Sequence, residues 1–167
     1  MPLKPILVRD LMTVGVPTCK RDTPAGDIAR FLLEKNVEGM CVLDEAGNGI
    51  GVVGVDELIT AYSLKENAQT LTAEDIMREG MPTLQADMPL TLAVQFMRDK
   101  GARIAYLIHN AAGIIYPAAF ITYHHILRCL AAADESELRD LGIEAERESP
   151  VETFIKRRDK AREKAGL

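Results

Sequence analysis

An internal repeat is the feature that most limits how this chain of 167 residues can fold. When the sequence is shifted by 65 positions, residues 8–35 align with residues 73–100, and nine of the 28 aligned positions are identical. The alignment continues to the end of both copies, with about three extra residues in the second copy around 111–117. A repeat of this length indicates two copies of one supersecondary unit.

Each copy predicts the same order of elements, β-α-β-β-α, and therefore an α/β fold. Pro24 and Pro89 suit the first turn of a helix, where the missing N–H costs nothing. Gly47-Asn48-Gly49 fits a tight hairpin turn, and Thr72 with Asp75 predicts a helix cap. The expected elements are a helical turn (8–12, 73–77), a strand (17–20, 82–85), a helix after each proline, two strands (40–43 and 50–53, 104–108 and 114–121) and a helix (56–64, 123–133).

Composition and charge exclude several classes of function. The net charge of -5 and a pI near 5.3 argue against a general nucleic-acid binder, which carries a basic excess. The three cysteines show no CxxC spacing, and the first ten residues lack the apolar stretch of a signal peptide. No apolar run approaches the roughly 20 residues of a membrane-spanning helix. We therefore expect a protein of the reducing cytoplasm that does not enter a membrane.

The residues after 133 do not belong to the repeat. They turn from acidic to basic, and Ser149-Pro150-Val151-Glu152 resembles a capping box with proline at the first helical position. We expect a terminal helix over about 150–165. It can dock on the repeats, pair with a second subunit, contact another protein or remain a solvated charged end, and the sequence leaves these roles open.

The doubled order, with Asp-Leu-Met or Asp-Ile-Met followed by Pro and Asp-x-Pro in each copy, resembles the tandem cystathionine-β-synthase (CBS) domain, also called a Bateman module. The resemblance covers about residues 5–133. It implies a first CBS domain at 5–66, a second at 70–133 and a charged helical tail at 134–167. The two repeats are then related by a pseudo-twofold axis, and the chain is a stand-alone module.

Members of this family suggest a regulatory role and not an enzymatic one. The resemblance implies binding of an adenosine-containing ligand, such as AMP, ADP, ATP or S-adenosylmethionine, in the cleft between the repeats. It also implies a homodimer that acts on an unidentified protein target. The alternative is a ligand-free dimerisation or interaction module with degenerate pockets. Neither reading requires a resident cofactor.

The family's ligand motif is altered differently in the two copies. In binding members, Gly and two apolar residues precede a Thr or Ser, and an Asp follows three residues later. The first copy has Gly54 and Glu57 at the last two positions, whereas the second has Thr122 and His125. The first has therefore kept a carboxylate without the hydroxyl, and the second a hydroxyl without the carboxylate. We expect asymmetric binding centred on Thr122.

Two further sets of residues match the family's pocket. A proline that shapes the base pocket is replaced by Cys41 and Tyr106, and the Tyr106 ring can stack on a base or fill the cavity. The segments that open each strand are expected to line the adenine and phosphate side, although a purely structural role also explains them. These segments are Val16, Pro17 and Thr18 in the first copy and Met81, Pro82 and Thr83 in the second.

The histidine at 125 raises two more hypotheses. A cationic imidazole would favour a phosphate, whereas the structural alternative is a partly exposed residue at the start of a helix. With His124 and Cys129 it suggests a metal site, but zinc normally requires three or four protein ligands, and we expect none here. Residues 49–54 match the dinucleotide-binding pattern Gly-x-Gly-x-x-Gly, but they form a predicted turn and strand and do not lead into a helix. No P-loop, metalloprotease or serine-hydrolase motif is present, so we expect no enzymatic activity.

Overall fold

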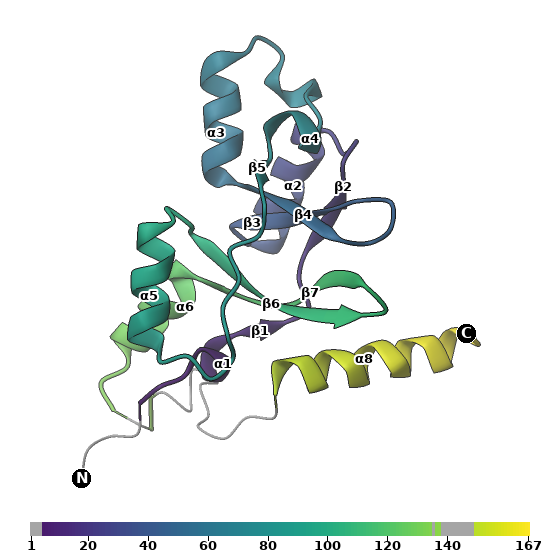
Figure 1. Cartoon of the computed structure of the whole chain (residues 1–167). Coiled ribbons are helices and arrows are strands. Elements are labelled where there is room, and N and C mark those ends of the chain that lie inside the picture. Colours follow the sequence, from purple (N-terminus) through teal and green to yellow (C-terminus); the bar gives the residue numbers. More distant parts are fainter. Residues whose placement is uncertain (1–4, 135, 138–148) are drawn as a thin grey trace. The chain divides into compact units, whose positions relative to one another are not determined.

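The computed structural model describes residues 5–134, 136–137 and 149–167 (Figure 1). The fold is mixed α/β with two sheets, as predicted. The chain divides into two compact units. The first-repeat unit comprises residues 16–81 and 109–117, and the second-repeat unit comprises the described residues of 1–15, 82–108 and 118–167.

The first-repeat unit contains a four-stranded sheet in the order β2-β3-β4-β5. The pair β2–β3 is parallel and the other two pairs are antiparallel. Ile28 and Leu32, on one face of the first long helix, pack against Val42 and Val53 of the sheet. The elements are β2 (Thr18–Lys20), α2 (Ala25–Lys35), β3 (Gly39–Leu43), β4 (Gly49–Gly54), α3 (Val55–Leu64), the 3-10 helix η1 (Ala68–Thr70), α4 (Ala73–Ile76) and β5 (Arg78–Glu79).

The second-repeat unit contains a three-stranded sheet in the order β1-β7-β6. Its core is built from aliphatic and methionine side chains, including Met12, Met97 and Ile121. The tips of β6 and β7, at 109–117, belong to the first-repeat unit. The elements are α1 (Val8–Leu11), β1 (Thr13–Val14), α5 (Leu90–Asp99), β6 (Ile104–Ala111), β7 (Ile114–Thr122), α6 (Tyr123–Ala131) and α8 (Pro150–Ala165).

The opening segment of each repeat completes the sheet of the other repeat. In the first-repeat unit β5 pairs with β4, with Gly51 opposite Glu79. In the second-repeat unit β1 pairs with β7, with Val14 opposite Ala119. The predicted domain boundaries follow the repeat in the sequence, whereas the compact units follow these exchanged strand pairs.

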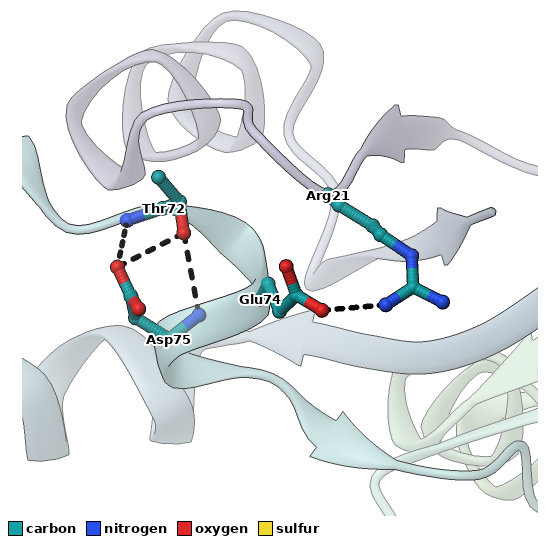
Figure 2. A network of polar contacts seen from close by, with 4 residues as sticks. All are labelled: Arg21, Thr72, Glu74 and Asp75. Atoms are coloured by element: carbon teal, nitrogen blue, oxygen red, sulfur yellow. Dashed lines mark hydrogen bonds and ion pairs between the residues drawn. The ribbon is translucent and has the colours of Figure 1, made fainter. Parts of the chain in front are cut away.

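Figure 2 shows how α4 is fixed in the first-repeat unit. The carboxylate of Asp75 accepts hydrogen bonds from the Thr72 N–H (2.8 Å) and hydroxyl (2.9 Å), and the Thr72 hydroxyl accepts one from the Asp75 N–H (3.4 Å). This is the predicted capping box. Arg21 donates to the carboxylate of Glu74, which ties α4 to the end of β2. The segment that joins the repeats is therefore held by side chains as well as by β5.

Several predicted details are wrong. Pro24 and Pro89 are the N-cap residues of α2 and α5, because their ψ angles of 140° and 137° are extended and not helical. Residues 82–85 form only an isolated bridge between Thr83 and Tyr106 and no strand. Ser149 makes no side-chain cap at the start of α8; its carbonyl accepts hydrogen bonds from Thr153 instead.

The terminal helix occurs where it was predicted, as α8 at residues 150–165. Its first turn is anchored in the second-repeat unit, where Pro150 is buried and Val151 packs against the core. Arg157 donates to the carbonyl of Val14 on β1 (3.3 Å). Most of the acidic segment that precedes it lies outside the described residues. Within the described part of the chain, no helix has the length and apolar character needed to cross a membrane.

Candidate functional site

The strand-opening segments occupy equivalent places in the two units. The carbonyl of Pro17 accepts a hydrogen bond from the N–H of Cys41 (2.9 Å), and the carbonyl of Pro82 accepts one from the N–H of Tyr106 (2.8 Å). Thr18 lies opposite Cys41, as Thr83 lies opposite Tyr106. The structure therefore pairs each Pro-Thr segment with Cys41 or Tyr106, the two residues that were expected to stand in place of a base-pocket proline.

The side chains at these positions differ in size. Cys41 and Tyr106 are both buried, with 0% and 1% of their surface exposed. The Sγ of Cys41 lies 3.2 Å from the Sδ of Met81, and burial raises the pKa of Cys41 to about 12, so the thiol stays protonated. Val16, which precedes β2, is half-buried.

Gly54 and Glu57 mark the start of α3 in the first-repeat unit. The Oε2 atom of Glu57 accepts a hydrogen bond from the Gly54 N–H (2.9 Å), so the carboxylate caps its own helix. Gly54 is buried and Glu57 is half-exposed. Gly39 lies opposite Gly54 and Cys41 lies opposite Thr18, which places Gly54 two strands from the Pro17–Thr18 segment in the same sheet.

Thr122 and His125 mark the start of α6 in the second-repeat unit, and both are buried. The Thr122 N–H donates to Nδ1 of His125 (3.1 Å), and the Thr122 hydroxyl lies 3.0 Å from the same nitrogen. On the other side of the ring, Nε2 lies 2.8 Å from the hydroxyl oxygen of Thr13 on β1. The edge-to-face contact with Phe120, at 5.7 Å between ring centroids, completes the surroundings of the imidazole.

These contacts assign the protonation of the His125 ring. Because a backbone N–H can only donate, Nδ1 must be the acceptor, and the single proton of the neutral ring then lies on Nε2, facing Thr13. Burial, and to a smaller extent the charges of Arg128 and His124, lower the pKa of His125 from 6.5 to about 4. The ring is neutral near pH 7. The structural alternative of a partly exposed residue is wrong, because His125 is buried. A neutral ring also lacks the positive charge on which the phosphate hypothesis depends.

The eleven predicted site residues fall into two groups. Six lie in the first-repeat unit and five in the second-repeat unit. Within each unit the structure brings together the strand-opening pair and, separately, the two residues at the start of the last helix. In the first-repeat unit they are Val16, Pro17, Thr18, Gly54, Glu57 and Met81; in the second-repeat unit they are Pro82, Thr83, Tyr106, Thr122 and His125.

The sequence did not predict the role of Thr13. It lies in the opening segment, far from His125 along the chain, and no motif includes it. It reaches His125 because Thr13 pairs with Phe120 in the exchanged β1–β7 contact. Among the described residues, no group of three or more His, Cys, Asp or Glu side chains is arranged to hold a metal ion, and this includes His124, His125 and Cys129.

The sequence also did not predict a groove beside Glu57. We call it the α3–α4 groove; it lies wholly in the first-repeat unit and has a volume of about 340 Å³. Apolar side chains from α3, α4 and the segment between them alternate with three carboxylates and one ammonium group. The lining residues are Asp56, Glu57, Thr60, Ala61, Leu64, Lys65, Leu71, Asp75 and Ile76.

Comparison with known sequences identifies the first repeat directly. The family model described as the CBS domain matches residues 8–64. An uncharacterized protein of Methanopyrus kandleri is 29% identical over 135 residues, which are 78% of this chain and 65% of that protein. An uncharacterized protein of Methanocaldococcus jannaschii is 39% identical over 54 residues, 32% of each chain. These matches span less than two thirds of the length of either relative.

Comparison with solved structures extends this result to both repeats. The CBS-domain pair of protein MJ0100, in complex with 5′-methylthioadenosine and S-adenosyl-L-methionine, has a TM-score of 0.66 at 18% identity. The alignment covers 76% of this chain and 97% of that one. The protein CBSX2 in complex with AMP has a TM-score of 0.59 at 21% identity, covering 74% of this chain and 95% of that one. Residues 8–64 match the CBS-domain family model, and the chain as a whole has the fold of a CBS-domain pair.

Proposed function

We propose that this chain is a regulatory module that binds an adenosine-containing ligand and transmits its binding to a partner protein. The observation that carries this proposal is the matched pair of Pro-Thr segments, whose proline carbonyls accept hydrogen bonds from the N–H groups of Cys41 and Tyr106. Two proteins of similar fold are in complex with adenosine-containing ligands: the CBS-domain pair of MJ0100 with 5′-methylthioadenosine and S-adenosyl-L-methionine, and CBSX2 with AMP. Regulation follows if the ligand binds one conformation of the module more tightly than another.

The chemistry of His125 narrows the class of ligand. A neutral imidazole supplies no positive charge for a phosphate, and both of its nitrogens already have partners in Thr122 and Thr13. The Thr122 hydroxyl can still accept a hydrogen bond, because a hydroxyl has two lone pairs. We therefore propose a ligand recognised through its adenosine part, of the S-adenosyl or methylthioadenosine kind, in preference to a nucleoside triphosphate.

The alternative is a ligand-free interaction module, and one observation favours it. Thr122 and His125 are buried and hydrogen-bonded to each other, and Thr13 pairs with the other ring nitrogen of His125. The polar groups at the N-terminus of α6 therefore have partners without a ligand. Gly54 has no side chain to offer in the first-repeat unit. A module of this kind would hold two proteins together and would not respond to a metabolite.

Thermal-shift measurements separate the two candidates. The full chain is heated with AMP, ADP, ATP, S-adenosylmethionine, NAD or a cyclic dinucleotide at a range of concentrations. A ligand at 100 times its Kd stabilises the folded chain by about 2.7 kcal/mol, which raises the Tm by several degrees. We expect the largest shift with S-adenosylmethionine. If none of these compounds moves the Tm, the chain is the ligand-free module.

We also propose that two chains pair as a homodimer. In the first-repeat unit α3 exposes Val55, Ile59 and Tyr62 at helical spacing, and Tyr62 is 79% exposed. In the second-repeat unit α6 exposes Leu127 and Leu130 in the same way. Apolar stripes of this kind mark association surfaces. Their aliphatic and aromatic side chains suit contact with an equally apolar copy.

Sedimentation velocity tests the homodimer. Wild-type chain should sediment as a dimer, and Ile59→Asp and Leu127→Asp should each shift it toward the monomer. Lys35→Asp, an exposed change on α2 outside these stripes, serves as the matched control and should leave the dimer intact. A wild-type chain that remains monomeric at concentrations well above those used for ligand binding would remove the homodimer proposal.

A further inference from the structure

The C-terminal end of α8 covers no core in the second-repeat unit. The helix has 16 residues, and residues 159–165, which we call the outer half of α8, are all exposed. A helix segment that covers no core gains nothing from tertiary packing, and isolated helices shorter than about 12–15 residues are marginal in water. The outer half is nevertheless capped by Gly166, whose φ of 70° is typical of a helix C-terminus. It forms a preformed element without an internal surface to cover.

The charge of α8 is opposite to that of the remaining chain. The helix carries six basic and three acidic residues, a net charge of +3, while the whole chain has -5, so the remainder carries -8. Lys156, Lys160 and Lys164 recur every four residues and form one stripe along the helix. Such a stripe suits an acidic, elongated surface.

The α3–α4 groove has the complementary properties. Three carboxylates and one lysine line it, a net charge of -2, above an apolar floor that includes the half-buried Leu71 and Ile76. Glu57 and Asp75 use their Oε2 and Oδ2 atoms for helix capping, so Oε1 and Oδ1 can accept from a cation. Long lysine side chains can lay their methylene groups on the apolar floor while the ammonium groups reach the carboxylates.

The groove and the proposed dimer stripe lie on different faces of α3. Asp56, Thr60 and Leu64 line the groove at helical spacing, whereas Val55, Ile59 and Tyr62 recur on the opposite side of the same helix. Occupation of the groove therefore does not compete with contacts made through the stripe. The two surfaces can be altered separately.

We propose that the α3–α4 groove receives the outer half of α8 from a second copy of the chain. The chain supplies both partners, an acidic groove and a basic helix, so no other protein is required. In a symmetric dimer the contact is made twice, because each copy donates its helix and each offers its groove. The two contacts together bury twice the surface of one, which brings the total closer to the buried area of a specific protein–protein interface. The proposal is independent of any adenosyl ligand.

Disulfide trapping between two different variants tests the proposal. Tagged Thr60→Cys and untagged Lys164→Cys chains, both carrying Cys129→Ser, are mixed and gently oxidised, and the tag distinguishes mixed dimers from self-dimers by mass. We expect a mixed dimer that forms faster than either self-dimer. Lys35→Cys in place of Lys164→Cys is the matched control and should give no mixed product above background.

Charge reversal supplies the second arm. Lys160→Glu on the helix chain should abolish the mixed product, and adding Asp56→Lys on the groove chain should restore it. The thermal shift with adenosyl ligands should be unchanged in these variants, so a failure here is separate from a failure of the ligand proposal. The proposal is overturned if no mixed product forms, or if charge reversal has no effect on it. It is also overturned if a single chain that carries both cysteines forms only an internal disulfide. The same holds if the chain binds RNA or anionic vesicles through α8 while no cross-link between two chains forms.

Discussion

The two repeats start their last helix with the same geometry but with different chemistry. In the first, the half-exposed carboxylate of Glu57 accepts the N–H of Gly54; in the second, the buried imidazole of His125 accepts the N–H of Thr122 and also reaches Thr13. The N-terminus of α3, with Glu57, lines the α3–α4 groove and is open to contact with other groups. The N-terminus of α6, with His125, is already bonded to Thr122 and Thr13. The comparison indicates that one fold can keep a helix start available in one repeat and tie it to an exchanged strand in the other.

The largest expected difference between the two starts is in stability. His125→Ala removes the three polar contacts of the imidazole ring and leaves the buried N–H of Thr122 unpaired, so we expect a loss of about 3 kcal/mol in the free energy of unfolding. Glu57→Ala removes one half-exposed cap and should cost about 1 kcal/mol. Urea titration of both variants measures the difference. Equal losses would show that the two helix starts are energetically alike.

Of these two helix N-termini, only that of α6, which contains His125, should make the stability of the chain depend on pH. The pKa of His125 is about 4 in the folded chain and 6.5 when unfolded, so the unfolded chain binds more protons between these values and stability falls as the pH falls. Its contribution is complete above pH 6.5. Between pH 7.5 and 5 we expect a loss of about 2 kcal/mol. In His125→Gln, measured by urea titration at both pH values, this loss should largely disappear; an undiminished loss would assign it to other groups.

The opening segments of the two repeats differ in how their helices, α1 and α4, are capped, and this difference should have an intermediate effect on stability. The Thr72 side chain caps α4, whereas α1 begins after Leu7, whose N–H is accepted by Asp10 at 2.9 Å. Thr72→Ala should therefore lower the free energy of unfolding by about 1 kcal/mol, with Thr70→Ala as an exposed control nearby. Thermal unfolding of both variants checks the value. A loss no larger than that of the control would mean that Arg21 and β5 alone hold the segment.

The smallest expected effect concerns the two hairpin turns. Gly47 takes the positive φ of the first turn (92°), but Ala112 takes one in the second (52°), next to Gly113. An L-residue in this region is strained by roughly 1–2 kcal/mol, and glycine removes that strain. Glycine also has a larger conformational entropy in the unfolded chain, which offsets part of this gain. Ala112→Gly should stabilise the chain by about 0.5 kcal/mol. A decrease in Tm would show that the Ala112 methyl group makes a contact that outweighs the strain.

Much of the fold followed from the sequence, because the repeat reports the same elements twice. The helix at 150–165 and the Thr72 cap were predicted because proline, threonine and aspartate act on neighbouring backbone groups. The strand pairs β1–β7 and β4–β5 were missed, since two-residue strands carry no periodic signal. Tertiary pairing alone makes them.

The candidate site was less accessible to sequence reasoning. The positions of Thr122 and His125 followed from the motif, but the burial that makes His125 neutral depends on Phe120 and on Thr13, more than a hundred residues away in the chain. The α3–α4 groove combines residues from α3, α4 and the segment between them, and no local pattern marks it. Site chemistry here is set by packing, which the sequence shows only indirectly.

Isothermal titration calorimetry with S-adenosylmethionine tests the central claim most directly, because it reports both affinity and stoichiometry. The account predicts one ligand per chain, with binding weakened at least tenfold in Thr122→Val and changed little in Glu57→Gln. Each variant is first shown to be folded at the temperature used. Two ligands per chain, or a loss of binding in Glu57→Gln with Thr122→Val unaffected, would contradict a module whose binding depends on its second repeat.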